Sequence, residues 1–375
     1  MQEIKKRRIV IASVLKPVND PRMFEKMGQT LSHHYEVHIF GTKAKNESTF
    51  DSVVLHPLST YRRLSIDRLL APVKILRKIL SLKPSLVIIC THEILWMVLL
   101  AKVFGGCRVI YDIRENYFRN ILYTNSFPPI IRAFVALYVR IKEWLTASFI
   151  DRFFLAESGY ELELNFPYGR AVVIENKLRK VVLPLADKWS TQDQNIHLLF
   201  SGTLAPSTGV FVAIDLAKRL HALDPKVRLH IVGFSPLQSV RHDIKNNIDG
   251  FHFIEFHEYA QPVPHTEILM AIQRADFGIV AYPTNRSTEN TIPTKLFEYL
   301  GYTLPIILID HPVWTEICKP WPAAITFNPA APNVDEILQG IHHANFYVNK
   351  PTDIFWEAEE KKLIQTVSEE INKLS

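Results

Sequence analysis

The chain of 375 residues lacks the features that mark membrane-spanning and disulfide-stapled proteins. No apolar run reaches the length of a membrane-spanning helix. The three cysteines, Cys90, Cys107 and Cys318, are odd in number, widely spaced and without metal-ligand spacing, which indicates a reduced, cytoplasmic setting. The basic N-terminus precedes only a short apolar run without a small-residue cleavage site, so it predicts a buried first strand rather than a signal peptide.

A metal-binding pattern is missing as well, although the chain has fifteen histidines. His33 and His34 are adjacent, as are His342 and His343, and adjacent side chains do not share a face of a helix or a strand. No Asp-x-Asp motif and no His and Cys cluster suggests a metal site elsewhere. We therefore expect neither a metal nor a cofactor.

The charge is unevenly distributed along the chain. The formal net charge is +5, but the first 187 residues carry +11 and the remaining residues carry −6. Such an excess of basic residues predicts that the first half meets something anionic. No nucleic-acid-binding motif accompanies the charge, so we expect contact with the anionic headgroups of a membrane rather than with a nucleic acid.

The first half alternates between predicted strands and predicted helices. The predicted strands are 8–14, 35–40, 85–90, 109–111, 152–156 and 171–174, and the predicted helices are 23–32, 69–81, 94–104 and 128–150. Alternation of this kind predicts a parallel sheet that is covered by helices on both faces. The helix 128–150 is apolar over most of its circumference, which is typical of a helix buried in a core but also of one at a membrane interface.

The pattern restarts after a polar segment, 187–195, which we interpret as a linker between two domains. In the second half the predicted strands are 197–201, 227–232, 251–256, 277–282 and 305–308, and the predicted helices are 209–222, 243–247 and 265–274. The last segment, 352–374, is amphipathic and must pack on another part of the chain. We predict domains at 1–187 and 188–350 and a terminal helix at 351–375.

The most informative motif is NTIPTKLFEYLGYTLPIIL, residues 290–308. It places Lys295 and Glu298 within one turn at the start of a helix, between two strand-like apolar runs. Ligands of doubly wound α/β domains bind at the carboxyl ends of the strands. A cation at a helix N-terminus suits a phosphate, and a carboxylate suits the paired hydroxyls of a sugar. The pair predicts a nucleotide-sugar site, although an isolated Lys-x-x-Glu is more often an exposed pair that supports its helix.

Glycines follow two further strands of the second half. Gly202 and Thr203 come after the strand at 197–201, and Gly233 and Phe234 end the strand at 227–232. Glycine lets backbone N–H groups approach a phosphate at a helix N-terminus or a nucleobase. A plain strand-to-helix turn explains the same residues equally well.

Polar side chains also follow strands of the first half. Asp112, Arg114 and Glu115 come after the strand at 109–111, and structural ion pairing is the alternative to a binding role for them. His92 follows the strand at 85–90 but can also be the first polar residue of a helix. Asp20 precedes Pro21, which suits a helix cap.

Taken in order, these motifs resemble family 4 glycosyltransferases. The succession SGT, IVG, FGIVAYP and PTKLFEYLGYTLPII is similar to the C-terminal domain of that family, and YDIRE resembles its Tyr-Asp-x-His-Glu motif. The resemblance, closest to the bacterial surface-polysaccharide type, implies a GT-B fold, in which two Rossmann-like parallel-sheet α/β domains face each other across a cleft. It also implies a nucleotide-sugar donor, metal-independent transfer with retention, and a final helix that crosses back to the first domain.

The resemblance assigns roles to residues of this chain. Glu298 would hold the donor ribose and Lys295 would approach the diphosphate, while Gly202 and Thr203 would line the phosphate loop and Gly233 and Phe234 would lie near the base. The acceptor side would comprise Asp20, His92, Asp112, Arg114 and Glu115.

Three positions depart from the family pattern. Asn290 stands where many members have a first acid, and Ser207-Thr208 stand where many have a basic pair. Arg114 replaces the family histidine, and because arginine stays protonated it cannot act as a base. Arg114 can still stabilise a phosphate or orient the acceptor.

The sequence thus predicts a hexosyltransferase-type glycosyltransferase that moves a sugar from a nucleotide diphosphate sugar to a polysaccharide or glycolipid acceptor. It would be cytoplasmic and peripheral at the inner face of the membrane. Two alternatives stay open, because a fold does not fix a function. One is a nucleotide-sugar epimerase of the same architecture, and the other is a non-catalytic protein that binds nucleotide sugars.

Overall fold

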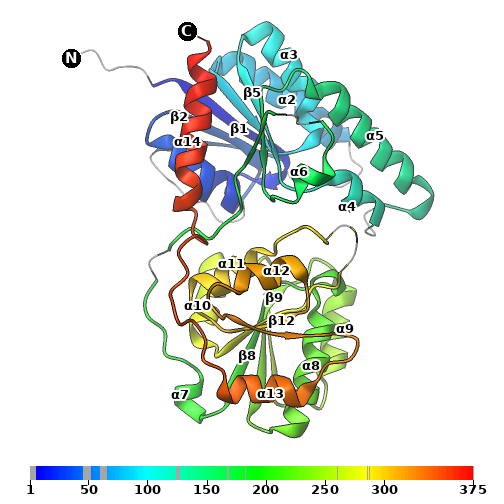
Figure 1. Ribbon diagram of the computed structural model, residues 1–375. Helices are drawn as coiled ribbons and strands as arrows, with labels where there is room; N and C mark the ends of the chain where they lie inside the picture. The colour runs from blue at the N-terminus through cyan, green and yellow to red at the C-terminus, as the bar shows by residue number, and fades with distance from the viewer. Residues whose placement is uncertain are drawn as a thin grey trace. The chain divides into compact units, whose positions relative to one another are not determined.

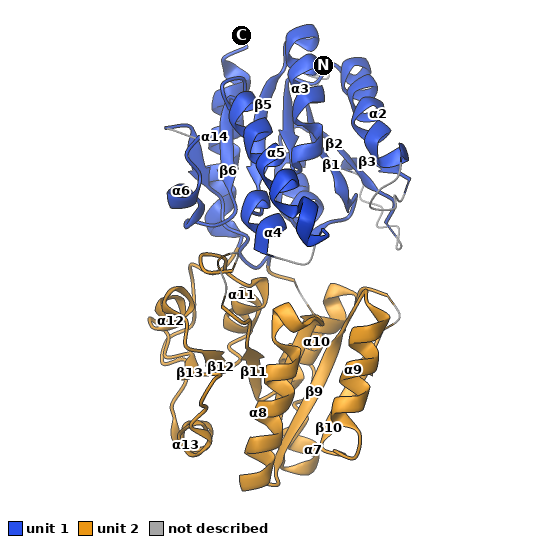
Figure 2. Cartoon of the chain, turned by 90° about the vertical axis from the view of Figure 1, so that its right-hand side faces the viewer, with its two compact units in different colours: residues 1–179, 356–375 blue, residues 180–355 orange. Residues whose placement is uncertain are grey.

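The computed structural model describes residues 6–44, 52–59, 66–123, 127–166, 169–181, 183–259, 261–284, 286 and 288–374. The chain divides into two compact units, coloured separately in Figure 2. The first unit consists of residues 1–179 and 356–375, and the second of residues 180–355. The polar segment predicted to be a linker lies in the second unit and contains a short helix, α7 (Ser190–Asp193).

The first unit is built on a seven-stranded parallel sheet with the strand order β3-β2-β1-β4-β5-β6-β7. The strands are β1 (Arg8–Pro17), β2 (Glu36–Thr42), β3 (Val53–Leu58), β4 (Leu86–Ile89), β5 (Arg108–Ile113), β6 (Arg152–Leu155) and β7 (Ala171–Val173). All four residues of β4 are buried, as expected for a central parallel strand covered on both faces. The edge strand β3 is only partly buried and lacks a continuous apolar run, so the sequence did not predict it.

Helices cover both faces of this sheet (Figure 1). They are η1 (Pro21–Gly28), α1 (Gln29–Ser32), α2 (Ile66–Leu82), η2 (His92–Ile94), α3 (Leu95–Gly105), α4 (Tyr117–Tyr123), α5 (Pro129–Ala147), α6 (Tyr160–Glu163) and α14 (Glu357–Asn372). The helix predicted over 23–32 is an eight-residue π-helix followed by one α-helical turn. Asp20 caps it by accepting hydrogen bonds from the backbone N–H groups of Arg22 and Met23.

The C-terminal helix α14 packs on the first unit, where Figure 1 shows it beside the early strands. Leu363, Val367 and Ile371 join the same apolar cluster as β1 and β2 residues. Trp356, which precedes the helix, is fully buried and donates from its ring nitrogen to the Thr30 hydroxyl at 3.0 Å. The amphipathic pattern of the last residues is therefore explained by packing on a sheet whose first two strands lie more than 300 residues earlier in the chain.

Helix α5 is the main departure from the expected helix packing. Only one strip of it is buried, including Ala136 and Val139, and the rest of its surface is exposed and apolar. The exposed large apolar residues of α5 are Ile130, Ile131, Phe134, Leu137, Tyr138, Ile141, Trp144 and Leu145. Of the two interpretations of this helix, burial on all sides is therefore wrong, and contact with a membrane interface stays a prediction. Among the described residues, every helix is too short or too polar to cross a bilayer.

The second unit repeats the architecture with a six-stranded parallel sheet in the order β10-β9-β8-β11-β12-β13. Its strands are β8 (Ile196–Thr203), β9 (Val227–Phe234), β10 (Ile254–Glu258), β11 (Phe277–Val280), β12 (Ile306–Ile309) and β13 (Ala324–Phe327). Its other helices are η3 (Pro206–Thr208), α8 (Val210–Leu223), α9 (Gln238–Ile248), α10 (His265–Arg274), α11 (Thr294–Gly301), α12 (Pro312–Cys318) and α13 (Val334–His343). The prediction of two parallel sheets covered by helices is confirmed.

Candidate active site

The donor residues predicted from the sequence lie at one edge of the second sheet. Its strands are parallel, so their carboxyl ends share this edge, where doubly wound domains bind ligands. Gly202 and Thr203 end β8, Gly233 and Phe234 end β9, and Lys295 and Glu298 lie on the helix that follows β11. The fold therefore brings three separate sequence motifs to a common boundary of the sheet.

The glycines after β8 and β9 are in backbone contact. A Cβ atom on Gly233 would lie 2.3 Å from the Gly202 carbonyl oxygen, so a larger residue does not fit there. Gly202 has φ +95°, which glycine adopts readily, and the space around its α-carbon is open. The N–H of Leu204 donates to the Phe234 carbonyl at 2.9 Å and holds the two loops together.

The loop after β8 leads into the N-terminus of α8. Gly209 has φ +85° and lies so close to β11 that a Cβ atom would be 1.8 Å from the Ala281 carbonyl oxygen. The Thr208 hydroxyl donates to the Thr203 carbonyl at 2.8 Å and so closes the loop. No side chain caps the first turn of α8, and its N–H groups suit an anion. Thr208 therefore has a structural role at the position of the family's basic residue.

Lys295 is buried between aromatic rings. Only 4% of the residue is exposed, and its ammonium lies 4.0 Å from the ring centroid of Phe200 and 5.0 Å from that of Tyr282. Among the described residues Nζ has no hydrogen-bond partner. Burial lowers the pKa of Lys295 to about 7, although Glu298 opposes this shift. A buried ammonium without a partner is costly unless something anionic pairs with it.

Glu298 is held by a residue that the sequence did not single out. Its Oε1 lies 3.0 Å from Nε2 of His265, the first residue of α10. On the same helix, Tyr299 is fully buried and its hydroxyl lies 3.0 Å from the Ser201 hydroxyl at the end of β8. The ring of Tyr299 occupies the space that a side chain at Gly278 would need. These contacts fix α11, and with it Lys295 and Glu298, against the sheet.

Asn290 lies in a neighbouring pocket of about 510 Å³. The pocket is lined by Thr284, Arg286, Glu289, Asn290, His311, Pro312 and Val313. His311 stacks on Trp314 with ring centroids 3.8 Å apart, and burial lowers the pKa of His311. The pocket around Asn290 thus contains one cation, Arg286, and one acid, Glu289, whereas aromatic rings surround Lys295.

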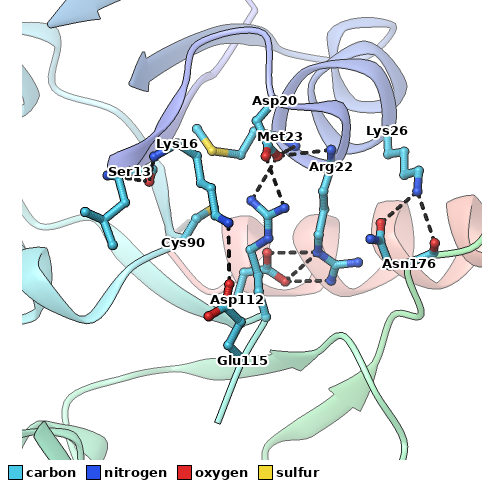
Figure 3. A network of polar contacts seen from close by, with 12 residues as sticks. Ser13, Lys16, Asp20, Arg22, Met23, Lys26, Cys90, Asp112, Glu115 and Asn176 are labelled. Carbon is cyan, nitrogen blue, oxygen red and sulfur yellow. Dashed lines mark hydrogen bonds and ion pairs between the residues drawn. The ribbon is translucent and has the colours of Figure 1, made fainter. Parts of the chain in front are cut away.

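In the first unit, two ion pairs join the segment after β1, including the start of η1, to the end of β5 (Figure 3). Arg22 binds Asp112 through two nitrogens, with Nη2 2.6 Å from Oδ1 and Nε 3.0 Å from Oδ2. The two side chains are 1% and 0% exposed. Arg114 binds Asp20 in the same forked manner, at 2.9 and 3.2 Å. Glu115 lies 3.4 Å from the ammonium of Lys16 at the margin of this cluster.

The pairing sets the ionisation of these groups. Burial disfavours both charges, but Arg114 outweighs it and lowers the pKa of Asp20, while Asp20 and Asp112 raise the pKa of Arg114. Asp20 and Arg114 are therefore both charged at neutral pH. Asp112 lies within β5 rather than beyond it, and its carboxylate is occupied by Arg22. The acceptor-side role of these residues stays a prediction.

His92 belongs to a different part of the first unit, where it meets Lys142 of α5. Nδ1 of His92 lies 2.8 Å from the Lys142 ammonium, and the ring contacts Tyr117 edge-on at 4.7 Å. Burial lowers the pKa of His92 to about 4 and that of Lys142 to about 8. The imidazole is therefore neutral at pH 7, and because Lys142 donates to Nδ1, the proton of His92 is on Nε2. No local pattern in the sequence indicates this pair.

The pair lies in the wall of a pocket of about 570 Å³ among α2, α3, α4 and α5. Its other lining residues are mostly apolar and include Leu69, Trp96, Met97, Ile121, Phe127, Val135 and Tyr138. Glu93, bound to Arg68 at 2.7 Å, and Glu115 add acidic groups. The pocket combines an apolar wall with a few polar groups, which is typical of a site for an organic ligand.

Comparison with known proteins finds a family similarity within the second unit. Residues 185–344 match the model of the family described as Glycosyl transferases group 1. That range falls inside the second unit, so this part of the chain is similar to group 1 glycosyltransferases. No curated protein sequence matches the chain.

Solved structures of similar architecture extend over nearly the whole chain. The catalytic domain of starch synthase IV from Arabidopsis thaliana, bound to ADP and acarbose, has a TM-score of 0.70 at 10% identity and covers 98% of this chain and 100% of its own. HepE from Anabaena in complex with UDP-glucose has a TM-score of 0.68 at 10% identity over 97% and 100%. Sucrose-phosphate synthase from Thermosynechococcus elongatus has a TM-score of 0.65 at 14% identity over 98% and 95%. The predicted GT-B fold is confirmed.

Proposed function

We propose that the chain transfers a sugar from a nucleotide diphosphate sugar to an acceptor bound by the first unit. The observation that carries the proposal is Lys295, a buried cation without a hydrogen-bond partner among the described residues, at the strand edge where ligands of this fold bind. The similarity to group 1 glycosyltransferases and the similar folds of proteins described with UDP-glucose or ADP support a nucleotide-sugar donor.

In this proposal the loops after β8 and β9 and the helix α11 each bind a different part of the donor. The diphosphate lies against Gly202, Thr203 and the uncapped first turn of α8, with its charge shared by Lys295. The base lies near Gly233 and Phe234, and Glu298, steadied by His265, accepts hydrogen bonds from the ribose hydroxyls. Asn290 lies beyond, in the pocket beside His311.

Catalysis would rest on electrostatic stabilisation of the leaving group. As the bond between the sugar and the phosphate breaks, negative charge grows on the departing diphosphate, and fixed donors placed there stabilise the transition state more than the ground state. A phosphate oxygen of the leaving group would take the proton of the acceptor hydroxyl, so Arg114 need not act as a base. Transfer would proceed with retention, to a hexosyl product and without a metal.

The acceptor would be a glycan or a lipid-linked glycan. The pocket of the first unit offers apolar wall for hydrocarbon, and it offers His92, Lys142 and Glu115 for polar groups. An acceptor with both kinds of surface fits this mixture better than a wholly polar one, because burying apolar area contributes about 25 cal/mol per Å².

The surface beside this pocket suits a membrane. Helices α2, α3 and α5 pack in one layer, and their outer side exposes apolar residues such as Phe104, Phe134 and Trp144. Two basic residues of α5, Arg140 and Lys142, bond to other residues of the first unit. Lys142 is 4% exposed and bonded to His92, and Arg140 donates to Asn116 at 2.8 Å.

Exposed basic residues lie instead on α2, at Lys74, Arg77 and Lys78. We therefore propose that apolar insertion by α3 and α5 dominates membrane contact, and that the α2 cations add attraction to anionic lipid. Flotation with vesicles tests this arrangement. We expect Phe134→Glu and Trp144→Glu together to abolish binding, while Leu223→Glu, at an exposed apolar residue of the second unit, leaves it unchanged. Equal binding by all variants would contradict the proposed face.

Donor binding and turnover test the function itself. A panel of nucleotide diphosphate sugars is screened by thermal shift, because a ligand at 100 times its Kd stabilises the fold by roughly 2.7 kcal/mol. The stabilising donor is then incubated with and without cell-derived acceptor lipids and glycans, and the products are analysed. Transfer only in the presence of acceptor supports the proposal. Conversion of the donor alone would indicate an epimerase, and binding without any product would indicate a binding protein.

A further inference from the structure

Three side chains of the kinds that can bind a metal converge on β9 and β10. His230 of β9 is directly opposite Glu255 of β10 in the strand register, and His257 follows two residues later, on the same face of the strand. His230 Nδ1, Glu255 Oε2 and His257 Nε2 are each 3.4 Å from the other two. The structure thus forms a triangle of two nitrogen donors and one carboxylate oxygen.

The size of this triangle matches a tetrahedral metal ion. Zn²⁺ binds histidine nitrogen at about 2.0–2.1 Å and carboxylate oxygen at about 2.0–2.2 Å. Two donors of a tetrahedron at such bond lengths lie roughly 3.3–3.5 Å apart. The separations are longer than those of good hydrogen bonds, about 2.7–3.2 Å, so hydrogen bonding does not explain why all three edges are equal. The geometry suits one ion above the three donors, with a fourth position left for water.

A chain of hydrogen bonds behind His230 holds it ready to coordinate. Nε2 of His230 lies 2.8 Å from Nδ1 of His197, and Nε2 of His197 lies 2.8 Å from the Asp193 carboxylate. If each imidazole donates toward Asp193, Nδ1 of His230 is left with a free lone pair that points at the triangle. Carboxylate and histidine partners of this kind orient metal-bound histidines and raise their basicity. Trp189 stacks on the His230 ring at 3.9 Å and fixes its plane.

We propose that His230, Glu255 and His257 bind a divalent transition-metal ion of the zinc type. Glu255 and His257 are 59% and 43% exposed, so an ion can enter from solvent. Glu255 supplies the negative charge that offsets the nearby cation of Arg228. The ion would fasten the edge strand β10 to β9. His230 precedes the strand-end Gly233 by three residues, about 10 Å along the strand, and His257 pairs with Val232, so the ion would lie on the two strands before their carboxyl ends.

Calorimetric titration of the metal-free full chain with ZnCl2 tests this site. We expect one ion to bind per chain and to raise the Tm. His257→Ala and Glu255→Gln should each weaken binding by at least tenfold. The matched control is His252→Ala, which removes an exposed histidine from the turn before β10 and should leave the affinity unchanged. Asp193→Asn should weaken binding by about 10- to 100-fold, as partners of metal-bound histidines do.

Both substituted ligands are exposed, so the metal-free variants should retain the Tm of the parent chain, and loss of binding can be separated from loss of fold. Replacement of zinc by Co²⁺ gives a second readout, since a tetrahedral Co²⁺ site absorbs visible light strongly. The proposal is overturned if the parent chain does not bind Zn²⁺, or if His257→Ala and Glu255→Gln bind it as tightly as His252→Ala does.

Discussion

Both units place buried charged residues near the carboxyl ends of their strands, but the two units differ in whether these charges are paired. In the first unit, Arg22 and Asp112 form a closed, buried pair, and Arg114 is bound to Asp20 beside it. In the second unit, Lys295 is equally buried but has only aromatic rings around its ammonium among the described residues. In the ion pair, the charge of Asp112 offsets the charge of Arg22. A buried cation without such a partner is costly unless an anion binds to it.

The contrast separates two meanings of a polar residue after a strand. In the sequence, Asp112 directly follows the predicted strand 109–111, and Lys295 belongs to the motif that comes after the predicted strand 277–282. The structure distinguishes them by their partners, because Asp112 is bonded to Arg22, while Nζ of Lys295 has no hydrogen-bond partner among the described residues. We therefore expect substitutions in the first pair to act mainly on stability, and substitutions at Lys295 to act mainly on donor binding.

The largest effect is expected for Asp112→Asn. The substitution leaves the Arg22 guanidinium buried without its counter-charge, and breaking one partner of a buried pair costs about 3–5 kcal/mol. Urea unfolding measures the loss. The control is Asp215→Asn, which breaks an Arg–Asp pair of similar length, 2.8 Å, on the exposed surface of α8 and should change little. Equal losses in both variants would show that burial does not distinguish the pairs.

A smaller effect, on binding rather than folding, is expected for Lys295→Ala and Glu298→Ala. Each removes a charge-assisted contact to the donor, worth on the order of 1.5–3 kcal/mol, so affinity should fall by roughly one to two decades. Calorimetry with the donor found by screening measures the change. Lys319→Ala, at an exposed lysine of α12, serves as the control. Unchanged affinity in both site variants would exclude this donor site.

The pH dependence of donor affinity should also report on Lys295. Its folded pKa of about 7 means that half of the ammonium is lost near neutrality, and the donor diphosphate prefers the charged form. Affinity should therefore fall as pH rises above 7, by at most about tenfold per pH unit, and Lys295→Met should remove this dependence. A pH profile that is the same in both proteins would show that Lys295 does not carry the charge.

The stability of the ligand-free chain should respond with the opposite sign. Because the folded pKa is below the ordinary value of 10.5, the unfolded chain binds more protons between pH 7 and pH 10.5. Relative to Lys295→Met, the parent should gain stability across that window, with the full penalty of the buried charge present below about pH 7. Parallel unfolding curves at pH 7 and pH 9 for the two proteins measure the difference.

The smallest effect is expected from chelation. The proposed sugar transfer uses Lys295 and no metal, and the ion pairs of the first unit need none. The rate of transfer should therefore be unchanged in EDTA. A Tm that falls in EDTA while the rate holds would agree with an ion on β10 that has no part in transfer. Loss of transfer that only a divalent ion restores would contradict the metal-independent reaction.

Much of the fold could be predicted from the sequence, because alternating apolar runs and amphipathic segments are local features. Strand β4 of the first sheet and strand β12 of the second are short apolar runs. Parallel pairing within each sheet follows from the helices that alternate with its strands. Edge elements such as β3 were missed, since a partly buried strand has no continuous apolar run. For α5 the sequence left burial and a membrane interface both open, because composition cannot say which side of an apolar helix finds a partner.

For the donor site, the sequence predicted the residues but not their surroundings. The order of Gly202, Gly233, Lys295 and Glu298 along the chain was enough to indicate a strand-edge site. Neither the contact of Glu298 with His265, 33 residues earlier, nor that of His92 with Lys142, 50 residues later, has a local pattern. The spacing of Glu255 and His257 put both on one strand face, but only the pairing of β9 with β10 adds His230.

The sequence by itself predicted the two α/β units and the residues proposed to bind a ligand, because period and order along the chain are enough for both predictions. Only the tertiary structure decided which buried charged groups have a charged partner and which have none among the described residues. That outcome depends on contacts between residues far apart in the chain. Asp112 meets Arg22 across 90 residues, whereas Lys295 meets the ring of Phe200 rather than a carboxylate. Burial makes each outcome energetically decisive, since an unpaired charge costs far more inside a protein than in water.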